Sequence, residues 1–120
     1  MIESSCHCGA LKLKIDGELP ATFTSCNCSY CSRAGSLMAY YNPQKVTVIA
    51  AEGASIRYIT GDKTLAFVIC KTCGNFSHWV SIDPNQTDRM GINARLFTNV
   101  DISKTKIRHF DGATTWKFLD

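Results

Sequence analysis

Seven cysteines carry most of the chemistry that this sequence can do. They fall into three tight groups: Cys6 and Cys8, then Cys26, Cys28 and Cys31, then Cys70 and Cys73. Thiols that are one or two residues apart can converge on a single metal ion, with sulfur about 2.3 Å from a zinc ion. Glycine follows both Cys8 and Cys73, and glycine allows the backbone to curl tightly around a metal. The spacing therefore predicts metal chelation.

The first and the last group of cysteines match each other in pattern, which indicates two halves of one site. Together they form a set of four cysteines, Cys6, Cys8, Cys70 and Cys73. Four protein ligands are typical of a closed structural zinc site, whereas a catalytic zinc keeps three and leaves one position open. The remaining trio, Cys26, Cys28 and Cys31, fits the second description. We therefore expect two zinc ions per chain, and the first should close a long loop and so contribute to folding.

Other interpretations of the cysteines stay open at this point. They could be buried structural thiols without metal. Cys70 and Cys73 could form a redox pair, although that motif is typical near a βαβ pattern and none is visible. Both zinc ions could be structural, with His7 or His78 as the ligand that completes the second site. A reductase would need a reactive cysteine outside the two metal sets, and the count leaves none.

The composition predicts one globular domain over residues 1–120. The sequence has no apolar run of membrane-spanning length and no signal peptide at its start, so we expect a cytoplasmic protein with reduced thiols and no membrane partner. Its formal net charge is +3. Seven thiolates and two zinc ions would bring that charge to zero, since they add seven negative and four positive charges. The basic residues are also scattered, so a nucleic-acid partner is not expected.

Strands must position these cysteines, because alternation of apolar and polar residues with period two dominates the chain. Leu11, Leu13 and Ile15 alternate with charged residues. The predicted strands cover residues 10–16, 21–26, 36–42, 45–52, 55–60, 64–70, 77–83, 90–97 and 106–110. The continuous apolar run over 64–70 predicts a central strand. Any helix should be short, near 32–36 or 85–89, so the fold class is mainly β.

Four stretches of the chain resemble the glutathione-dependent formaldehyde-activating enzyme family, which includes centromere protein V. They read CHCGALKLKI, CNCSYCSRAGSLMAYY, FVICKTCGNFSHW and GINARLF, and the resemblance runs over residues 4–118. It implies an Mss4-like fold of several small, coiled antiparallel sheets. It also implies a structural zinc on the outer four cysteines and a catalytic zinc on Cys26, Cys28 and Cys31. This agrees with the partition drawn from spacing.

The resemblance further implies a carbon–sulfur lyase that joins glutathione to formaldehyde, giving S-(hydroxymethyl)glutathione. Glutathione carries two carboxylates, so we expect a guanidinium group near the trio, from Arg33 or, second, from Arg95. Tyr30 and Trp79 could wall the pocket, although Trp79 fits a core position better. The second zinc site should be partly empty in purified protein, and exposed strand edges would allow a homodimer. The alternative function is a non-catalytic zinc module that binds a protein or nucleic-acid partner.

Overall fold

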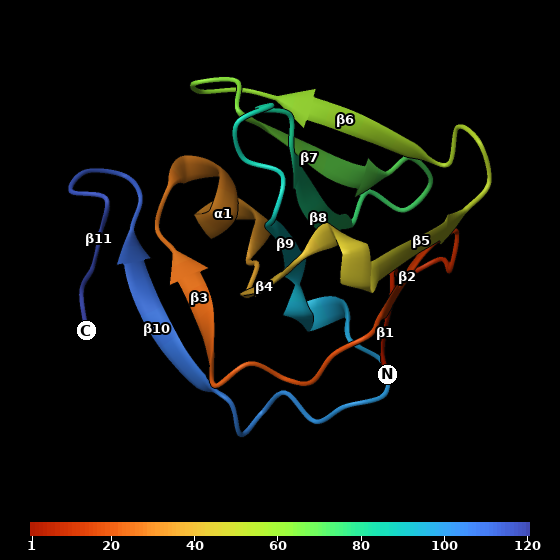
Figure 1. Cartoon of the computed structure of the whole chain (residues 1–120), viewed down its shortest axis with the longest axis horizontal. Coiled ribbons are helices and arrows are strands. Elements are labelled where there is room, and N and C mark those ends of the chain that lie inside the picture. The colour runs from red at the N-terminus through yellow and green to blue at the C-terminus, as the bar shows by residue number, and fades with distance from the viewer.

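Two β-sheets and one short α-helix make up the protein, shown in Figure 1 as a computed structural model that describes residues 1–120. The strands are β1 (Ile2–Ser5), β2 (Leu11–Ile15), β3 (Thr22–Cys26), β4 (Met38–Tyr41), β5 (Val46–Ala50), β6 (Ser55–Ile59), β7 (Leu65–Cys70), β8 (Phe76–Ser81), β9 (Met90–Asn93), β10 (Lys106–Asp111) and β11 (Lys117–Phe118). The helices are α1 (Ser29–Ala34) and the 3-10 turns η1 (Pro43–Lys45) and η2 (Ala94–Leu96). The predicted mainly β fold with several sheets is confirmed.

The smaller sheet has the strand order β1-β2-β5. Its middle strand, β2, buries Leu11, Leu13 and Ile15 and exposes Lys12 and Lys14, as the alternation predicted. Successive side chains of a strand point to opposite faces, so one face of β2 is apolar along its whole length. That face packs against the larger sheet, where Leu13 and Ile15 join Met90 and Ile92 in one hydrophobic cluster. β1 lies outside every predicted strand, because its four residues are too few to establish a period.

The larger sheet has eight strands in the order β11-β10-β3-β4-β9-β8-β7-β6. Every neighbouring pair in it is antiparallel except β3 and β10, which are parallel. The expectation of antiparallel sheets is therefore wrong for this one pair. Parallel neighbours need a long connection, and here nearly eighty residues of intervening chain separate Cys26 from Lys106, so no tight hairpin dictates the direction.

The strand predicted over 64–70 is confirmed as β7, which pairs with β6 on one side and β8 on the other, although it lies next to the edge of the sheet and not at its centre. Ala66, Phe67 and Val68 are consecutive and all buried, so both faces of β7 are covered. Phe67 packs with Met38, Phe76 and Trp79. The expectation that Trp79 belongs to the core is thus correct, since only 6% of it is exposed. Cys70 is the last residue of β7.

Helical segments differ from the sequence-based expectations in position. The helix expected near 32–36 begins earlier, as α1, because the Cys28 sulfur caps it by accepting a hydrogen bond from the Cys31 N–H. It ends at Gly35, which has a φ of 66°. The stretch 85–89 forms turns and no helix. The strand expected over 90–97 stops at Asn93, because the Asn93 side chain accepts from the N–H of Arg95 and starts η2.

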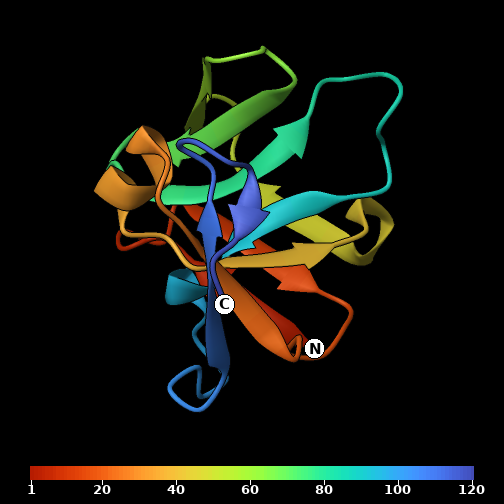
Figure 2. The same cartoon turned by 90° about the vertical axis from the view of Figure 1, so that its left-hand side faces the viewer.

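The C-terminal strands close the larger sheet next to α1. Figure 2 shows β10 and β11 in front of β3, with α1 beside the loop that joins them. β3 ends at Cys26, and its register partner in β10 is Phe110. The end of β3, the start of α1 and the loop after β10 therefore meet at one corner of the molecule, which holds the central cysteines.

Two sheet edges are exposed and partly apolar. The edge strand β6 exposes all five of its residues, and Ile56, Tyr58 and Ile59 are each about half exposed. The edge strand β5 exposes Val48 and Ile49 in the same way. A homodimer through such an edge stays a prediction. None of the helices is long and apolar enough to cross a membrane.

Candidate metal centres

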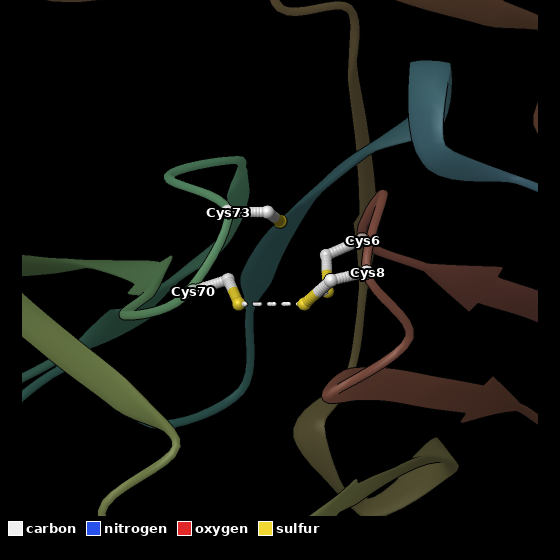
Figure 3. A group of neighbouring side chains, drawn as sticks. All are labelled: Cys6, Cys8, Cys70 and Cys73. Carbon is white, nitrogen blue, oxygen red and sulfur yellow. Dashed lines mark hydrogen bonds between the residues drawn. The ribbon is translucent and has the colours of Figure 1, made fainter.

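The outer four cysteines converge from two turns that are far apart in the sequence. Cys6 and Cys8 lie between β1 and β2, whereas Cys70 ends β7 and Cys73 lies in the turn before β8. Figure 3 shows the four sulfurs pointing toward one another across the gap between these turns. All four Sγ atoms lie within 4.8 Å of one another. We call this four-cysteine cluster the clasp.

Each turn of the clasp curls in the same way. The N–H of Gly9 donates to the carbonyl of Cys6 at 3.1 Å, and the N–H of Gly74 donates to the carbonyl of Cys70 at 2.9 Å. Both glycines have a positive φ, 82° and 78°, which residues with a Cβ rarely adopt. The prediction that these glycines shape two matching metal-binding turns is therefore supported by their backbone geometry.

The sulfur distances in the clasp fit one tetrahedral metal ion. Cys6 Sγ and Cys8 Sγ are 3.7 Å apart, and Cys8 Sγ and Cys70 Sγ are 3.6 Å apart. Zinc–sulfur bonds of about 2.3 Å would place tetrahedral sulfurs about 3.8 Å apart. A disulfide needs about 2.05 Å between sulfurs, and all seven cysteines are free thiols. The clasp thus has the ligand type, number and spacing for a closed metal site.

The backbone favours thiolates in part of the clasp. The N–H groups of Asn75 and then Cys8 lower the pKa of the Cys73 thiol to about 6. The N–H of Cys73 lowers the pKa of Cys70. The N–H of Ala10 favours the Cys8 thiolate, but desolvation and the neighbouring sulfurs outweigh it and raise the pKa of Cys8 to about 11. A bound cation would offset the unfavourable effects of desolvation and of the neighbouring sulfurs, because it allows all four sulfurs to be thiolates.

The central cysteines form a second cluster at the junction of β3 and α1, which we call the trio. Cys26 ends β3, Cys28 caps α1, and Cys31 lies in the first turn of α1. The N–H of Cys31 donates to Cys28 Sγ at 3.3 Å, and the N–H of Cys28 approaches Cys26 Sγ at 3.5 Å. The three sulfurs lie within 4.8 Å of one another. They could hold one metal ion.

No histidine, carboxylate or further cysteine completes the trio as a fourth ligand. His78, one of the two candidates for that role, is 2% exposed and contacts the Ser77 hydroxyl at 2.9 Å. Burial, together with the nearby Arg57, lowers the pKa of His78 to about 4, so it is a neutral core residue. His7, the other candidate, lies in the clasp turn and donates its backbone N–H to Asn75. The histidine-closed second site is therefore wrong for this structure.

The thiols of the trio differ from one another in acidity. Burial raises the pKa of Cys26 and that of Cys31. Burial also acts on Cys28, but hydrogen bonds from the Cys31 N–H and from the two neighbouring thiols outweigh it and lower the pKa of Cys28. Cys28 is therefore the sulfur on which negative charge is best accommodated before any cation binds.

The loop after β10 packs directly on the trio. A Cβ added to Gly112 would lie 2.5 Å from Cys26 Sγ, far inside contact distance, so a larger residue would force the loop or the sulfur to move. Asn27 holds this loop in place. Its Nδ2 donates to Asp111 Oδ1 at 3.0 Å, and its Oδ1 accepts from the N–H of Ala113 at 3.0 Å. Sequence reasoning assigned no role to Asp111 or Gly112, because the loop lies more than eighty residues away.

A cavity of about 520 Å³ lies beside the trio. Its lining residues are Ser25, Cys26, Asn27, Cys31, Ser32, Gly35, Ser36, Arg95, His109, Phe110, Leu119 and Asp120. Of the two arginines expected near the trio, Arg95 lines the cavity, whereas Arg33 does not and donates to the carbonyl of Ser29 at 2.9 Å. Tyr30 stacks on Phe67 with ring centroids 3.9 Å apart and is not part of the lining.

His109 and Asp120 in this lining were missed at the sequence level. His109 Nδ1 lies 3.0 Å from Asp120 Oδ2. His109 is one of five residues in the predicted strand 106–110, and nothing in its local sequence marks it out. Only the pairing of β10 with β3 shows that it reaches the same cavity as Cys26.

A crystal structure of a protein from Rhodobacter sphaeroides has the same fold, with a TM-score of 0.71 and 24% identity, over 88% of this chain and 98% of that one. Among curated protein sequences, none matches this chain. The model of the glutathione-dependent formaldehyde-activating enzyme family matches residues 1–111. Because that match spans nearly the whole sequence, including all seven cysteines, the chain belongs to the glutathione-dependent formaldehyde-activating enzyme family.

Proposed function

We propose that this protein is a zinc-dependent carbon–sulfur lyase that joins a thiol such as glutathione to an aldehyde such as formaldehyde. The product would be an S-(hydroxymethyl) thiol adduct, and the same site would catalyse its breakdown. Family membership supports a function that involves glutathione and formaldehyde. The sulfur-only ligand sets support zinc as the metal, since zinc is commonly bound by cysteine thiolates in tetrahedral sites.

The observation that carries this proposal is the unequal number of ligands in the two centres. The clasp offers four sulfurs, which would fill the coordination of a zinc ion. The trio offers three, with no fourth side chain from the protein, and two of its cysteines line a cavity of about 520 Å³. Three protein ligands and an accessible fourth position are typical of catalytic zinc.

Cys26, Cys28 and Cys31 would hold the catalytic zinc. When bound, that zinc would supply a Lewis acid that lowers the pKa of a substrate thiol and keeps it as a thiolate. The protein's part is to fix the three sulfurs through the end of β3 and the cap of α1. Three thiolates donate more charge to a metal than three imidazoles would, so a fourth ligand should exchange readily.

The reaction adds the S–H group of the thiol across the carbonyl of the aldehyde. The S–H bond breaks, a sulfur–carbon bond forms, and the carbonyl oxygen gains the proton, so no oxidant or reductant is needed. The position of Arg95 in the cavity lining supports it, rather than Arg33, as the partner of a substrate carboxylate. A guanidinium group can form two parallel hydrogen bonds with a carboxylate.

Metal analysis and a thiol titration test this function. Wild-type protein reconstituted under reducing conditions should contain two zinc ions per chain, and Cys28→Ser should contain one while it stays folded. Glutathione added to the zinc-loaded wild type should perturb NMR signals of residues 26–33, and exchange spectroscopy should show faster interconversion of glutathione and its formaldehyde adduct. If millimolar glutathione moves no signal near the trio, glutathione is not the substrate.

The alternative is a zinc module without catalytic activity that binds a protein or nucleic-acid partner. X-ray absorption spectroscopy of the zinc-loaded wild-type protein distinguishes the two functions. A fourth ligand at the trio that exchanges with added thiol supports catalysis. A fourth ligand that does not change on thiol addition supports the module.

A further inference from the structure

The cavity beside the trio contains an imidazole that is held by a carboxylate. His109 Nδ1 lies 3.0 Å from Asp120 Oδ2, and the backbone N–H of His109 donates to Asp120 Oδ1 at 3.0 Å. An ionised carboxylate only accepts hydrogen bonds, so Nδ1 carries the proton in this pair. The other ring nitrogen, Nε2, then has a free lone pair when the imidazole is neutral. The side chain of His109 is 61% exposed, so a substrate can reach it.

The sheet brings this imidazole to the cavity that Cys26 and Cys31 also line. In the parallel pairing of β3 and β10, His109 is the register partner of Ser25, the residue immediately before Cys26. The other charged or titratable groups around His109 are few. Arg95, Cys26 and Cys31 line the same cavity, and Arg108 contacts Asp120 through Nε at 3.9 Å. Asp120 is the only residue with a carboxylate side chain in the lining of this cavity.

We propose, on the basis of the thiol–aldehyde chemistry above, that His109 is the proton carrier of this reaction. His109 Nε2 takes the proton of the thiol, and the sulfur lone pair attacks the carbonyl carbon. The electron pair of the carbonyl double bond moves to oxygen. His109 then returns its proton to that oxygen. Asp120 is a positioning residue, because it acts by holding the ring through Nδ1.

Kinetics of His109→Gln test the proposal with the zinc-loaded, full-length protein. A positioned general acid–base contributes about 10²–10⁴-fold, so kcat for adduct interconversion should fall at least about 100-fold. KM for glutathione and the zinc content should stay near the wild-type values. Asp120→Asn should lower kcat less, by roughly 10-fold, as expected for a positioning residue. Lys106→Gln is the matched control, since Lys106 is exposed on the same strand and does not line the cavity.

A second measurement reads His109 without any turnover. In ¹⁵N-labelled, zinc-loaded wild type, glutathione alone should shift the Nε2 resonance of His109, and the Lys106→Gln control should behave identically. If glutathione moves signals of the trio but not Nε2, or if His109→Gln keeps its kcat, His109 is not the proton carrier and the proposed function stands. If the wild type does not accelerate adduct formation at all, the proposed function fails and this proposal fails with it.

Discussion

The clasp and the trio use the same ligand, the cysteine thiol, but connect very different lengths of chain. In the clasp, the contacting sulfurs of Cys8 and Cys70 are 62 residues apart. In the trio, all ligands lie within residues 26–31. A metal that bridges distant segments removes much conformational freedom from the unfolded chain, whereas one held by a single short segment removes little. The clasp should therefore determine stability and the trio should not.

The two sites also differ in what surrounds them. The clasp is closed by its own two turns, and each sulfur faces the other three. A loop that is remote in sequence packs against Cys26 of the trio, and the bond between Asn27 and Asp111 holds it there. The trio also lies beside a cavity. Four protein ligands that fill the coordination of a metal ion suit a structural site. Three ligands beside a cavity suit a site where a further ligand exchanges. The predictions below test this division.

The largest effect is expected from Cys73→Ser, which removes one ligand of the clasp. Structural zinc binding in small domains is worth about 10–16 kcal/mol, which matches or exceeds the whole stability of a typical domain, about 5–15 kcal/mol. Cys73→Ser should therefore lose its cooperative unfolding transition, as followed by circular dichroism during heating. Cys28→Ser is the matched variant and should keep that transition. Equal loss in both variants would erase the distinction between clasp and trio.

The buried His78 should make the free energy of unfolding depend on pH. This dependence is distinct from any loss of bound metal in acid. Burial lowers the pKa of His78 to about 4 from 6.5. Between these values the unfolded chain binds a proton that the folded chain does not, so the free energy of unfolding should fall as the pH falls through this window. The shift corresponds to about 3 kcal/mol between pH 7 and pH 4. His78→Asn should lose this contribution to the pH dependence in denaturant titrations, and an unchanged pH dependence would contradict the assignment.

Gly112→Ala should weaken the trio alone. The new Cβ would lie 2.5 Å from Cys26 Sγ, so the loop or the sulfur must move. Changes next to metal ligands typically cost about 10–100-fold in metal affinity, and we expect a loss of that size at the trio with the clasp still filled. Competition with a chelator measures the metal affinity of the trio and of the clasp. Gly17→Ala is the control, because its Cβ would come no closer than 3.3 Å to another residue, the Tyr41 ring, and would touch no cysteine.

The smallest effect is expected at the bond between Asn27 and Asp111. The amide of Asn27 and then Thr115 hold the pKa of Asp111 below its ordinary value. The stabilisation of the loop is therefore present above the ordinary carboxyl pKa of about 3.9 and is lost as the pH falls through the lower, folded value. Asn27→Ala should raise the pKa of Asp111, measured by NMR titration, and speed hydrogen exchange at the Ala113 N–H. No change in either would mean that Asn27 does not hold the loop.

Local features of the fold were predictable because they depend on neighbouring residues. The alternation of Leu11, Leu13 and Ile15 identifies β2 directly, since side chains of a strand alternate between two faces. The apolar run of β7 identifies a strand covered on both sides. The helix was placed a few residues too late, because its cap is a cysteine sulfur, Cys28, and the usual capping residues are Ser, Thr, Asp and Asn.

The sequence by itself predicted the division of the seven cysteines into four and three, because thiols one or two residues apart can converge on one point and the two outer pairs share a glycine after the second cysteine. Only the tertiary structure decided which remote groups surround the trio. Gly112, His109 and Asp120 reach it because β10 pairs in parallel with β3. That pairing joins segments about eighty residues apart, and no local period encodes it. The three cysteine groups are therefore properties of short segments, whereas the assembly of the clasp and the surroundings of the trio are properties of the folded sheets.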